Sequence, residues 1–435
     1  MNILRFITCG SVDDGKSTLI GRLLYDSHAV SPDILQAIER QSRNTPGGGI
    51  DLSLLTDGLR SEREQGITID VAYKYFSTPR RKFIIADAPG HVQYTRNMVT
   101  GASNADCALI LVDARHGVIE QTRRHSAIAS LLGIPHIVLC INKMDMVDYS
   151  VKVFDRIVAD YRAFAQQLNF KDLVCIPLSA LAGDNVVYPS HSSDDSKSSD
   201  EYQGRNMPWY AGPTLLEHLE SVELSADRNL RDPRFQVQYV IRPKSDDLHD
   251  YRGYAGQIQS GIYRKGDRVT VFPSGLSSSI TAIEVHQQEV EEAFAPQPAV
   301  LHLADDLDIG RGATIVRSDD LPTVSQDVEA ILCITDSTPL RVGARFLLQH
   351  NSATVKAIVK DVYYKLDINT LEKIPQPYAL AINDLAHVRL RTSEPLAFDP
   401  YAENRKTGAF ILIHENTCQT VAAGMIKNIE PDYVI

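Results

Sequence analysis

Apolar and polar positions alternate in two different ways along the chain. In the first half, apolar runs typical of strands cover residues 3–8, 68–76, 82–87, 107–113, 136–142 and 173–177. The runs between residues 107 and 142 are almost continuously apolar, as parallel strands buried on both faces are. Segments with a helical period lie between these runs. The pattern predicts an α/β domain with a mostly parallel sheet and helices on both faces.

Two local signals add detail to this first domain. The basic run at residues 80–82 lies between two strand-like runs, so it predicts a hairpin turn rather than a nucleic-acid patch. Thr214, with Glu217 three residues later, has the spacing of a capping box. It predicts the start of a helix that closes the domain.

Beyond residue 226 the pattern changes to short strand-like runs separated by Gly, Pro and Asp turns, and helical periods nearly vanish. Such spacing is typical of small all-β barrels or sandwiches. The first set of expected strands covers residues 235–241, 253–260, 268–272, 301–303 and 313–316, with a turn at 274–279. We therefore predict three domains: an α/β P-loop domain over residues 1–226 and two all-β barrel domains over residues 227–323 and 324–435.

Composition narrows the class of protein. The 435 residues include 44 Lys and Arg against 55 Asp and Glu, a net charge of −11, which argues against a broad basic surface for nucleic acid. The six cysteines are scattered without a C-x-x-C pair, so we predict reduced, buried thiols in a cytoplasmic protein and no zinc site. No segment is long and apolar enough for a membrane span, and the N-terminus lacks a signal peptide's apolar core. We expect no membrane partner.

The stretch GSVDDGKS at residues 10–17 follows a strand-like run and precedes a helical one. Its spacing, G-x-x-x-x-G-K-[ST], is that of a phosphate-binding loop. Gly10 and Gly15 let backbone N–H groups point at phosphates, Lys16 reaches the β- and γ-phosphates, and the Ser17 hydroxyl ligates Mg²⁺. A glycine turn before an ordinary helix is the alternative. The candidate phosphate-binding residues are Gly10, Ser11, Val12, Asp13, Asp14, Gly15, Lys16, Ser17 and Thr18.

Three further motifs lie where predicted strands end. Asp87-Ala88-Pro89-Gly90-His91 places a carboxylate at the carboxyl edge of the sheet and a glycine whose N–H can approach a terminal phosphate. Asn142-Lys143-Met144-Asp145 offers a carboxylate that accepts two N–H groups from guanine, a pair that adenine lacks. Ser179-Ala180-Leu181 offers a backbone N–H to the base carbonyl. Each motif alone is weak, but their order predicts a site for a guanine nucleotide, GTP or GDP.

These motifs, a GITID segment and two trailing β domains resemble the translational GTPases of the elongation factor Tu type over the whole chain. Residues 10–27, 62–78, 87–103, 208–220 and 404–413 are similar to the large, GTP-hydrolysing subunit of bacterial ATP sulfurylase (sulfate adenylyltransferase). Elongation factors typically have histidines where this chain has Ser11 and Asp14. Val92 departs from the sulfurylase pattern, in which a Glu is more usual.

The resemblance implies a heterodimer with a smaller subunit of the ATP pyrophosphatase type. That subunit would convert ATP and sulfate to adenosine 5′-phosphosulfate and pyrophosphate, while this chain would hydrolyse GTP and couple it to that uphill synthesis. Some relatives fuse an adenylylsulfate kinase domain after this point, so a fused or associated kinase stays open. An elongation factor-type GTPase that delivers aminoacyl-tRNA is the alternative function. The sulfurylase interpretation involves no nucleic acid.

The same resemblance implies roles in catalysis. Ser17 and Thr68 would ligate Mg²⁺ directly, and Asp87 would reach it through water. His91 follows the D-A-P-G motif at the position where elongation factors orient the attacking water. The expected catalytic residues are therefore His91, Lys16 and Thr68.

Guanine would be bound by the remaining motifs. Asn142 and Asp145 would recognise the base, Lys143 would pack over the ring, and Ser179 with Ala180 would close the base pocket. For Asp13, contact with a monovalent cation and a loop-stabilising Asx turn are equally compatible with the sequence.

Overall fold

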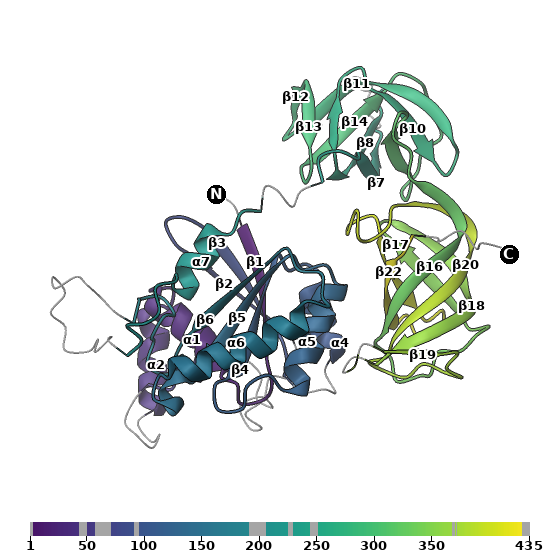
Figure 1. Cartoon of the computed structure of the whole chain (residues 1–435). Helices are drawn as coiled ribbons and strands as arrows, with labels where there is room; N and C mark the ends of the chain where they lie inside the picture. The colour runs from purple at the N-terminus through teal and green to yellow at the C-terminus, as the bar shows by residue number, and fades with distance from the viewer. Residues whose placement is uncertain are drawn as a thin grey trace. The chain divides into compact units, whose positions relative to one another are not determined.

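The computed structural model describes residues 3–42, 50–56, 71–90, 95–190, 206–224, 229–243, 251–367, 370 and 372–428. Its contacts divide the chain into two units, Met1–Leu224 and Ser225–Ile435. Among the described residues, every α-helix belongs to the first unit, and the second unit is built from strands (Figure 1). Each unit has its own hydrophobic core.

A six-stranded sheet forms the centre of the first unit. Its strands are β1 (Ile3–Cys9), β2 (Ala72–Ser77), β3 (Lys82–Asp87), β4 (Cys107–Asp113), β5 (His136–Asn142) and β6 (Asp172–Pro177), in the order β2-β3-β1-β4-β5-β6. β2 runs antiparallel to β3, and the other neighbours are parallel. β4 and β5 are buried along their whole length, which accounts for their continuous apolar sequence. The predicted α/β class is confirmed.

Helices cover both faces of this sheet. They are α1 (Lys16–Asp26), α2 (Pro32–Ser42), α4 (Thr95–Ala102), α5 (Glu120–Leu131), α6 (Val151–Ala165) and α7 (Leu215–Ser221). Leu19 of α1 and Leu215 of α7 share a core with Phe6 and Phe83 on one face. Ile110 and the other alternate residues of β4 face the opposite side, where α4, α5 and α6 lie (Figure 1). The helices cover the faces of the sheet, and the loops extend from the ends of its strands.

The hairpin between β2 and β3 is tied to the last helix of the unit. Arg81 is 7 % exposed and donates to the carbonyl oxygens of Leu219 (2.9 Å) and Val222 (2.6 Å). These carbonyls belong to the C-terminal end of α7, where a cation is favourable. At the other end of α7, Thr214 and Glu217 form the predicted capping box. The basic run is therefore part of a hairpin, as predicted.

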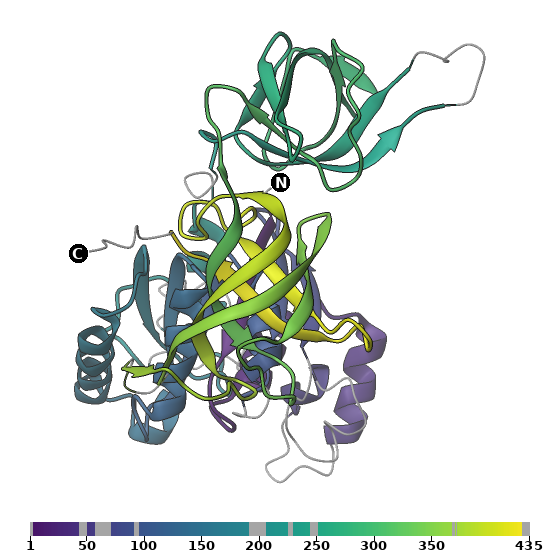
Figure 2. The same cartoon turned by 90° about the vertical axis from the view of Figure 1, so that its right-hand side faces the viewer.

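The first half of the second unit is a closed barrel. Its strands are β7 (Arg234–Ile241), β8 (Gly253–Ser260), β10 (Arg268–Phe272), β11 (Leu276–Val285), β14 (Pro298–Leu303) and β15 (Thr314–Arg317). They pair antiparallel in the order β10-β15-β7-β8-β14-β11, and β10 pairs with β11 to close the ring (Figure 2). The short strand β12 (Gln288–Val290) extends β11, and β9 (Ile262–Arg264) pairs with β13 (Glu292–Phe294).

The prediction of a turn over residues 274–279 is wrong in its second part, because β11 already begins at Leu276. The reason lies in the serines of this strand. Ser278 occupies a buried position and bonds Asp305 through its hydroxyl at 2.8 Å. A hydrogen-bonded serine there replaces the apolar residue that would have shown a period of two.

The second half of this unit is another closed barrel. Its strands are β16 (Thr323–Ile334), β17 (Arg345–His350), β18 (Ala353–Leu366), β20 (Leu385–Phe398), β21 (Ala409–Ile413) and β22 (Thr420–Ile426), in the order β17-β21-β22-β16-β20-β18. β17 pairs with β18 to close the ring, and the short β19 (Lys373–Pro375) extends β18. Closure leaves neither barrel with a long free edge. The two predicted barrels are confirmed.

A buried ion-pair cluster joins the two barrels within this unit. Arg234, 3 % exposed, lies 2.9 Å from Asp399 and 3.1 Å from Asp320. Asp399 also accepts a hydrogen bond of 2.6 Å from Thr407. Because Arg234 and Asp399 are largely removed from water, their mutual pairing is what makes their burial tolerable.

All six cysteines are free thiols. Cys9, Cys107, Cys140 and Cys333 are buried, and burial raises the pKa of Cys9 and of Cys333 to about 12. Cys175 is only partly buried, and the prediction of buried cysteines is wrong for Cys418, which is exposed. It lies in the turn between β21 and β22 with a φ of 57°, away from the barrel interior.

Candidate functional site

The phosphate-binding loop lies between β1 and α1. Gly15 is the N-cap residue of α1 with a φ of 89°, and no side chain caps this helix. Lys16 is 7 % exposed, and its Nζ donates to the carbonyl oxygens of Gly10 (3.0 Å) and Ser11 (2.7 Å). Uncapped N–H groups and a lysine ammonium thus meet at one loop. That combination is what an anion site at a helix N-terminus requires.

Burial shapes the charges of this loop. It lowers the pKa of Lys16, although Asp87 and Asp14 favour the charged ammonium. Burial also raises the pKa of Asp14, although Ser11 N–H donates to its Oδ2 at 2.5 Å and Lys16 is near. A desolvated ammonium is stabilised by an added anion. The loop therefore suits a polyphosphate electrostatically as well as sterically.

Oxygen donors for a metal lie next to Lys16. Asp87 ends β3, is 1 % exposed and accepts a hydrogen bond of 3.0 Å from Thr8 Oγ1. Ser17 is half-buried in the first turn of α1. A hydroxyl and a carboxylate are ligands that fit Mg²⁺. Thr68 and His91, the other residues predicted for this part of the site, lie outside the described residues, as does Val92.

The segment after β3 packs directly on the phosphate-binding loop. A Cβ built on Gly90 would lie 2.5 Å from Lys16 Nζ and 2.6 Å from the carbonyl oxygen of Gly10. Only a residue without a side chain fits at that distance. Ala88 beside it is also buried. The structure thus brings together the two motifs predicted to contact phosphate.

The loops predicted to bind guanine are joined by hydrogen bonds. Asn142 Nδ2 donates to the carbonyl oxygen of Asp14 (2.8 Å), and its Oδ1 accepts from the N–H of Ala180 (2.9 Å). Ser179 Oγ donates to Asp145 Oδ1 at 2.6 Å. One asparagine therefore links three predicted motifs, and the serine orients the carboxylate assigned to guanine.

Lys143 stretches across the edge of the sheet. Its Nζ donates to the carbonyl oxygen of Asp13 and lies 3.1 Å from Asp113 Oδ2. Burial opposes the charge of Asp113, but hydrogen bonds from Arg115 and Lys143 hold the pKa of its carboxyl well below the usual range. These two contacts fix the end of the Lys143 side chain between the phosphate-binding loop and the end of β4. Of its neighbours, Met144 is fully buried and Leu181 is 71 % exposed.

Sequence reasoning missed four residues that shape these loops. Thr8 bonds Asp87, Asp113 holds Lys143, and Arg22 of α1 donates to the carbonyl oxygens of Ala180 (3.2 Å) and Leu181 (2.6 Å). Gln121 of α5 donates to the carbonyl oxygen of Gly90 at 3.1 Å. Asp113 ends a predicted strand, a signal like that of Asp87. The other three carry no motif.

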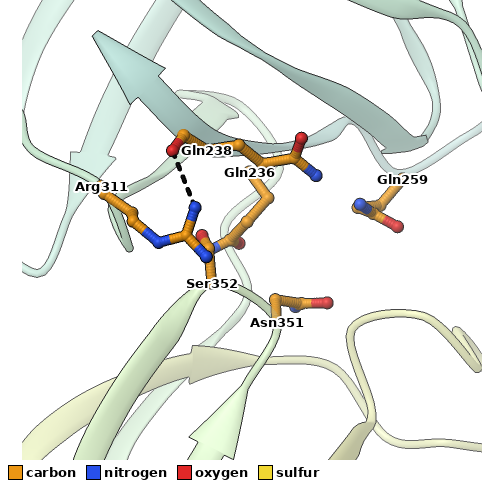
Figure 3. A pocket seen from close by; sticks show the side chains of 6 residues that line it. All are labelled: Gln236, Gln238, Gln259, Arg311, Asn351 and Ser352. Carbon is orange, nitrogen blue, oxygen red and sulfur yellow. Dashed lines mark hydrogen bonds between the residues drawn. The ribbon is translucent and has the colours of Figure 1, made fainter.

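The second unit contains a separate polar pocket of about 360 Å³. It is lined by Gln236, Gln238, Gln259, Arg311, Asn351 and Ser352 (Figure 3). Arg311 Nη1 donates to the carbonyl oxygen of Gln238 at 3.0 Å. These residues supply no pair of acid and base groups. In the described ranges, no group of three or more His, Cys, Asp or Glu could hold a metal ion.

Comparison with known proteins assigns the chain to a family. Residues 1–225 match the elongation factor Tu GTP binding domain, and residues 327–427 match the GTP-eEF1A C-terminal domain-like family. A sulfate adenylyltransferase subunit 1 from Bacteroides fragilis (strain YCH46) is 49 % identical over 427 residues, which cover 98 % of this chain and 86 % of that protein. The chain belongs to the sulfate adenylyltransferase subunit 1 family.

Longer relatives of this family also match. A bifunctional enzyme CysN/CysC from Mycobacterium tuberculosis (strain ATCC 25618 / H37Rv) is 51 % identical over 425 residues, and one from Rhodopirellula baltica is 52 % identical over 428 residues. The chain spans 67 % and 63 % of these two proteins. Similarity to the sulfate adenylyltransferase subunit 1 family thus extends through the GTP-binding domain and both barrels. Across the described residues, no helix has the length and apolarity needed to cross a membrane.

Proposed function

We propose that this chain is the GTP-hydrolysing subunit of a sulfate adenylyltransferase in sulfate assimilation. In the cytoplasm, it couples GTP hydrolysis to the synthesis of adenosine 5′-phosphosulfate from ATP and sulfate by a smaller partner subunit of the ATP pyrophosphatase type. The observation that carries this proposal is the 49 % identity to a sulfate adenylyltransferase subunit 1 over 98 % of the chain. That match continues far beyond the GTP-binding domain.

The loops described above divide the binding of GTP between them. Lys16 and the N-terminal N–H groups of α1 hold the β- and γ-phosphates. Asp145, oriented by Ser179 at 2.6 Å, accepts the two N–H groups of guanine. Asn142 keeps the phosphate and base loops at a fixed separation through its two hydrogen bonds. GTP is therefore selected over ATP by the carboxylate of Asp145.

Hydrolysis needs a metal and a positioned water. Ser17, Thr68 and Asp87 are the residues that would hold Mg²⁺. When bound, Mg²⁺ neutralises charge on the β- and γ-phosphate oxygens. His91 orients the attacking water, and Lys16 stabilises the charge that develops on the phosphate oxygens. Water attacks the γ-phosphorus, the bond to the β–γ bridging oxygen breaks, and GDP and phosphate result.

The coupled reaction takes place on the partner. Sulfate attacks the α-phosphorus of ATP and releases pyrophosphate, which is strongly uphill. GTP hydrolysis here makes the joint process favourable only if the two subunits change state together. The barrels of the second unit are the parts of the chain proposed to contact the partner, because they carry no catalytic groups of their own in the described ranges.

The decisive experiment measures GTP hydrolysis by the purified chain, alone and with the smaller subunit, ATP and sulfate. We expect hydrolysis to rise with the partner, and adenosine 5′-phosphosulfate to accumulate in proportion to the GTP consumed. Lys16→Ala should abolish both activities. Unchanged GTP turnover on adding partner and sulfate would contradict the coupling. Tight, GTP-dependent binding of aminoacyl-tRNA would instead support a delivery factor.

A further inference from the structure

Gln121 connects helix α5 to the phosphate site. It lies in the first turn of α5 and is 8 % exposed. Its Nε2 donates to the carbonyl oxygen of Gly90 at 3.1 Å and lies 3.0 Å from His125 Nε2. Gln121 and His125 are four residues apart on one helix, so they share a face. A side chain of α5 thus holds a backbone group of the D-A-P-G segment.

The contact fixes a crowded piece of backbone. Gly90 lies so close to the phosphate-binding loop that an added Cβ would be 2.5 Å from Lys16 Nζ. The carbonyl of Gly90 belongs to the planar peptide unit that follows its Cα, so restraining this carbonyl limits the rotation of that unit and the position of the Gly90 Cα to which it is bonded. Gln121 therefore limits how far Gly90 can move away from the lysine that binds the terminal phosphates.

The amide orientation of Gln121 follows from its partners. The carbonyl oxygen of Gly90 only accepts, so the amide nitrogen must face it. The second amide hydrogen then points at His125 Nε2, which must be unprotonated, and the imidazole carries its proton on Nδ1. That Nδ1 has no hydrogen-bond partner among the described residues, and His125 is 2 % exposed. A buried donor without a partner lowers the stability of the fold. A contribution of His125 to the stability of α5 therefore does not by itself account for a histidine at this position.

Burial keeps this imidazole neutral. It lowers the pKa of His125 to about 3, and the positive charges of Lys16 and Arg124 act in the same direction. The unprotonated Nε2 therefore remains a hydrogen-bond acceptor at neutral and mildly acidic pH. His125 therefore keeps Gln121 directed at Gly90.

We propose that Gln121 is a positioning residue for GTP hydrolysis, which holds Gly90 where its backbone N–H can reach the γ-phosphate, and that His125 fixes Gln121 in this role. The inference rests on the proposed GTPase function. GDP has no γ-phosphate, so its affinity should not depend on Gln121. Hydrolysis should depend on it, because a displaced Gly90 no longer stabilises the charge that develops on the γ-phosphate oxygens.

The test compares variants of the full chain in the presence of the smaller subunit, ATP and sulfate. Gln121→Leu should lower the single-turnover rate of GTP hydrolysis by about tenfold or more, while the Kd for GDP stays within about twofold. Gln167→Leu makes the same change at an exposed position and should leave both values unchanged. Melting temperatures of all variants show whether each one folds.

His125 provides the rescue experiment. His125→Leu removes the acceptor and should also slow hydrolysis, whereas His125→Gln keeps an acceptor at the place of Nε2 and should restore most of the rate. A merely structural histidine would show no such difference between the two variants.

The outcomes separate the two proposals. If the wild type binds and hydrolyses GTP but Gln121→Leu does so at the same rate, the positioning role is wrong and the GTPase stands. If Gln121→Leu loses GDP affinity as much as hydrolysis, Gln121 merely supports the loop and the inference fails. If the wild type itself neither binds nor hydrolyses GTP, the proposed function fails with it.

Discussion

Asn142 Nδ2 donates a hydrogen bond of 2.8 Å to the carbonyl oxygen of Asp14, 128 residues earlier in the chain. The asparagine is 2 % exposed, and its Oδ1 accepts from Ala180 N–H at 2.9 Å. A Cβ on the neighbouring Gly15 would clash with the same Nδ2. The buried amide of Asn142 therefore joins the phosphate-binding loop to the two loops predicted to bind guanine.

Replacing this amide should loosen both halves of the site. Asn142→Ala leaves the carbonyl of Asp14 and the N–H of Ala180 without their partner, at about 1–3 kcal/mol for each buried group. We expect GDP affinity to fall at least about tenfold, since about 1.4 kcal/mol corresponds to that factor. Titration with a fluorescent GDP measures it. Asn169→Ala, at an exposed position, is the control. Equal affinities for both variants would refute the joint role of Asn142.

The specificity for guanine should reside in Asp145. Asp145→Asn removes the carboxylate predicted to accept the two guanine N–H groups and should weaken GDP binding by about 1.5–3 kcal/mol. The new amide can donate to the second carbonyl of xanthine. Xanthosine diphosphate should therefore bind more tightly to the Asp145→Asn variant than to the wild type. Competition titrations with both nucleotides test this exchange. Asp148→Asn nearby is exposed and should change neither affinity. Unmoved GDP affinity in Asp145→Asn would mean that the base lies elsewhere.

His125 should make the first unit sensitive to acid. Its folded pKa is about 3 because it is buried and faces Lys16 and Arg124, whereas an unfolded chain protonates histidine near 6.5. Between these values the unfolded state binds the additional proton, so stability decreases as pH falls through this window. From pH 7 to pH 5 the loss attributable to His125 is about 2 kcal/mol.

His125→Gln removes this titration, so the variant should lose about 2 kcal/mol less than the wild type over that interval. The other titrating groups affect both proteins and cancel in the comparison. Urea unfolding followed by fluorescence measures the difference, because the single tryptophan, Trp209, reports on the first unit. Identical losses in the two proteins would show that His125 is not buried in its neutral form.

The ion-pair cluster between the barrels should be essential to the second unit. Arg234→Ala leaves Asp399 buried without its guanidinium, at a cost of about 3–5 kcal/mol. We expect a clearly lower urea midpoint for the unfolding of the barrels. Far-ultraviolet circular dichroism during a urea titration measures this midpoint. Arg231→Ala removes an exposed arginine three residues earlier and should have little effect. A midpoint like that of the control would mean that Arg234 and Asp399 add no net stability.

The classes of the elements and the chemistry of the loops follow from the order of residues along the chain. The strands β4 and β5 could be predicted from their apolar sequence because a strand buried on both faces has to be continuously apolar. The phosphate-binding loop at residues 10–17 could be predicted because phosphate binding requires glycines and a lysine at fixed spacing. The similarity to ATP sulfurylase is also a property of the sequence. It follows from those motifs, and the comparison with known proteins confirms it.

The residues that support these loops without belonging to a motif are identified by the folded structure alone. Gln121 and Gly90 meet because the first turn of α5 and the segment after β3 both follow the carboxyl ends of parallel strands. The residues near either one along the chain give no signal of that contact. The inward serine of β11, Ser278, likewise gains its place from a hydrogen bond to Asp305, which follows the neighbouring strand β14. Periodicity and motif spacing are properties of neighbouring residues, whereas these contacts depend on how distant segments pack. The chain topology sets that packing, and it becomes visible only in the folded structure.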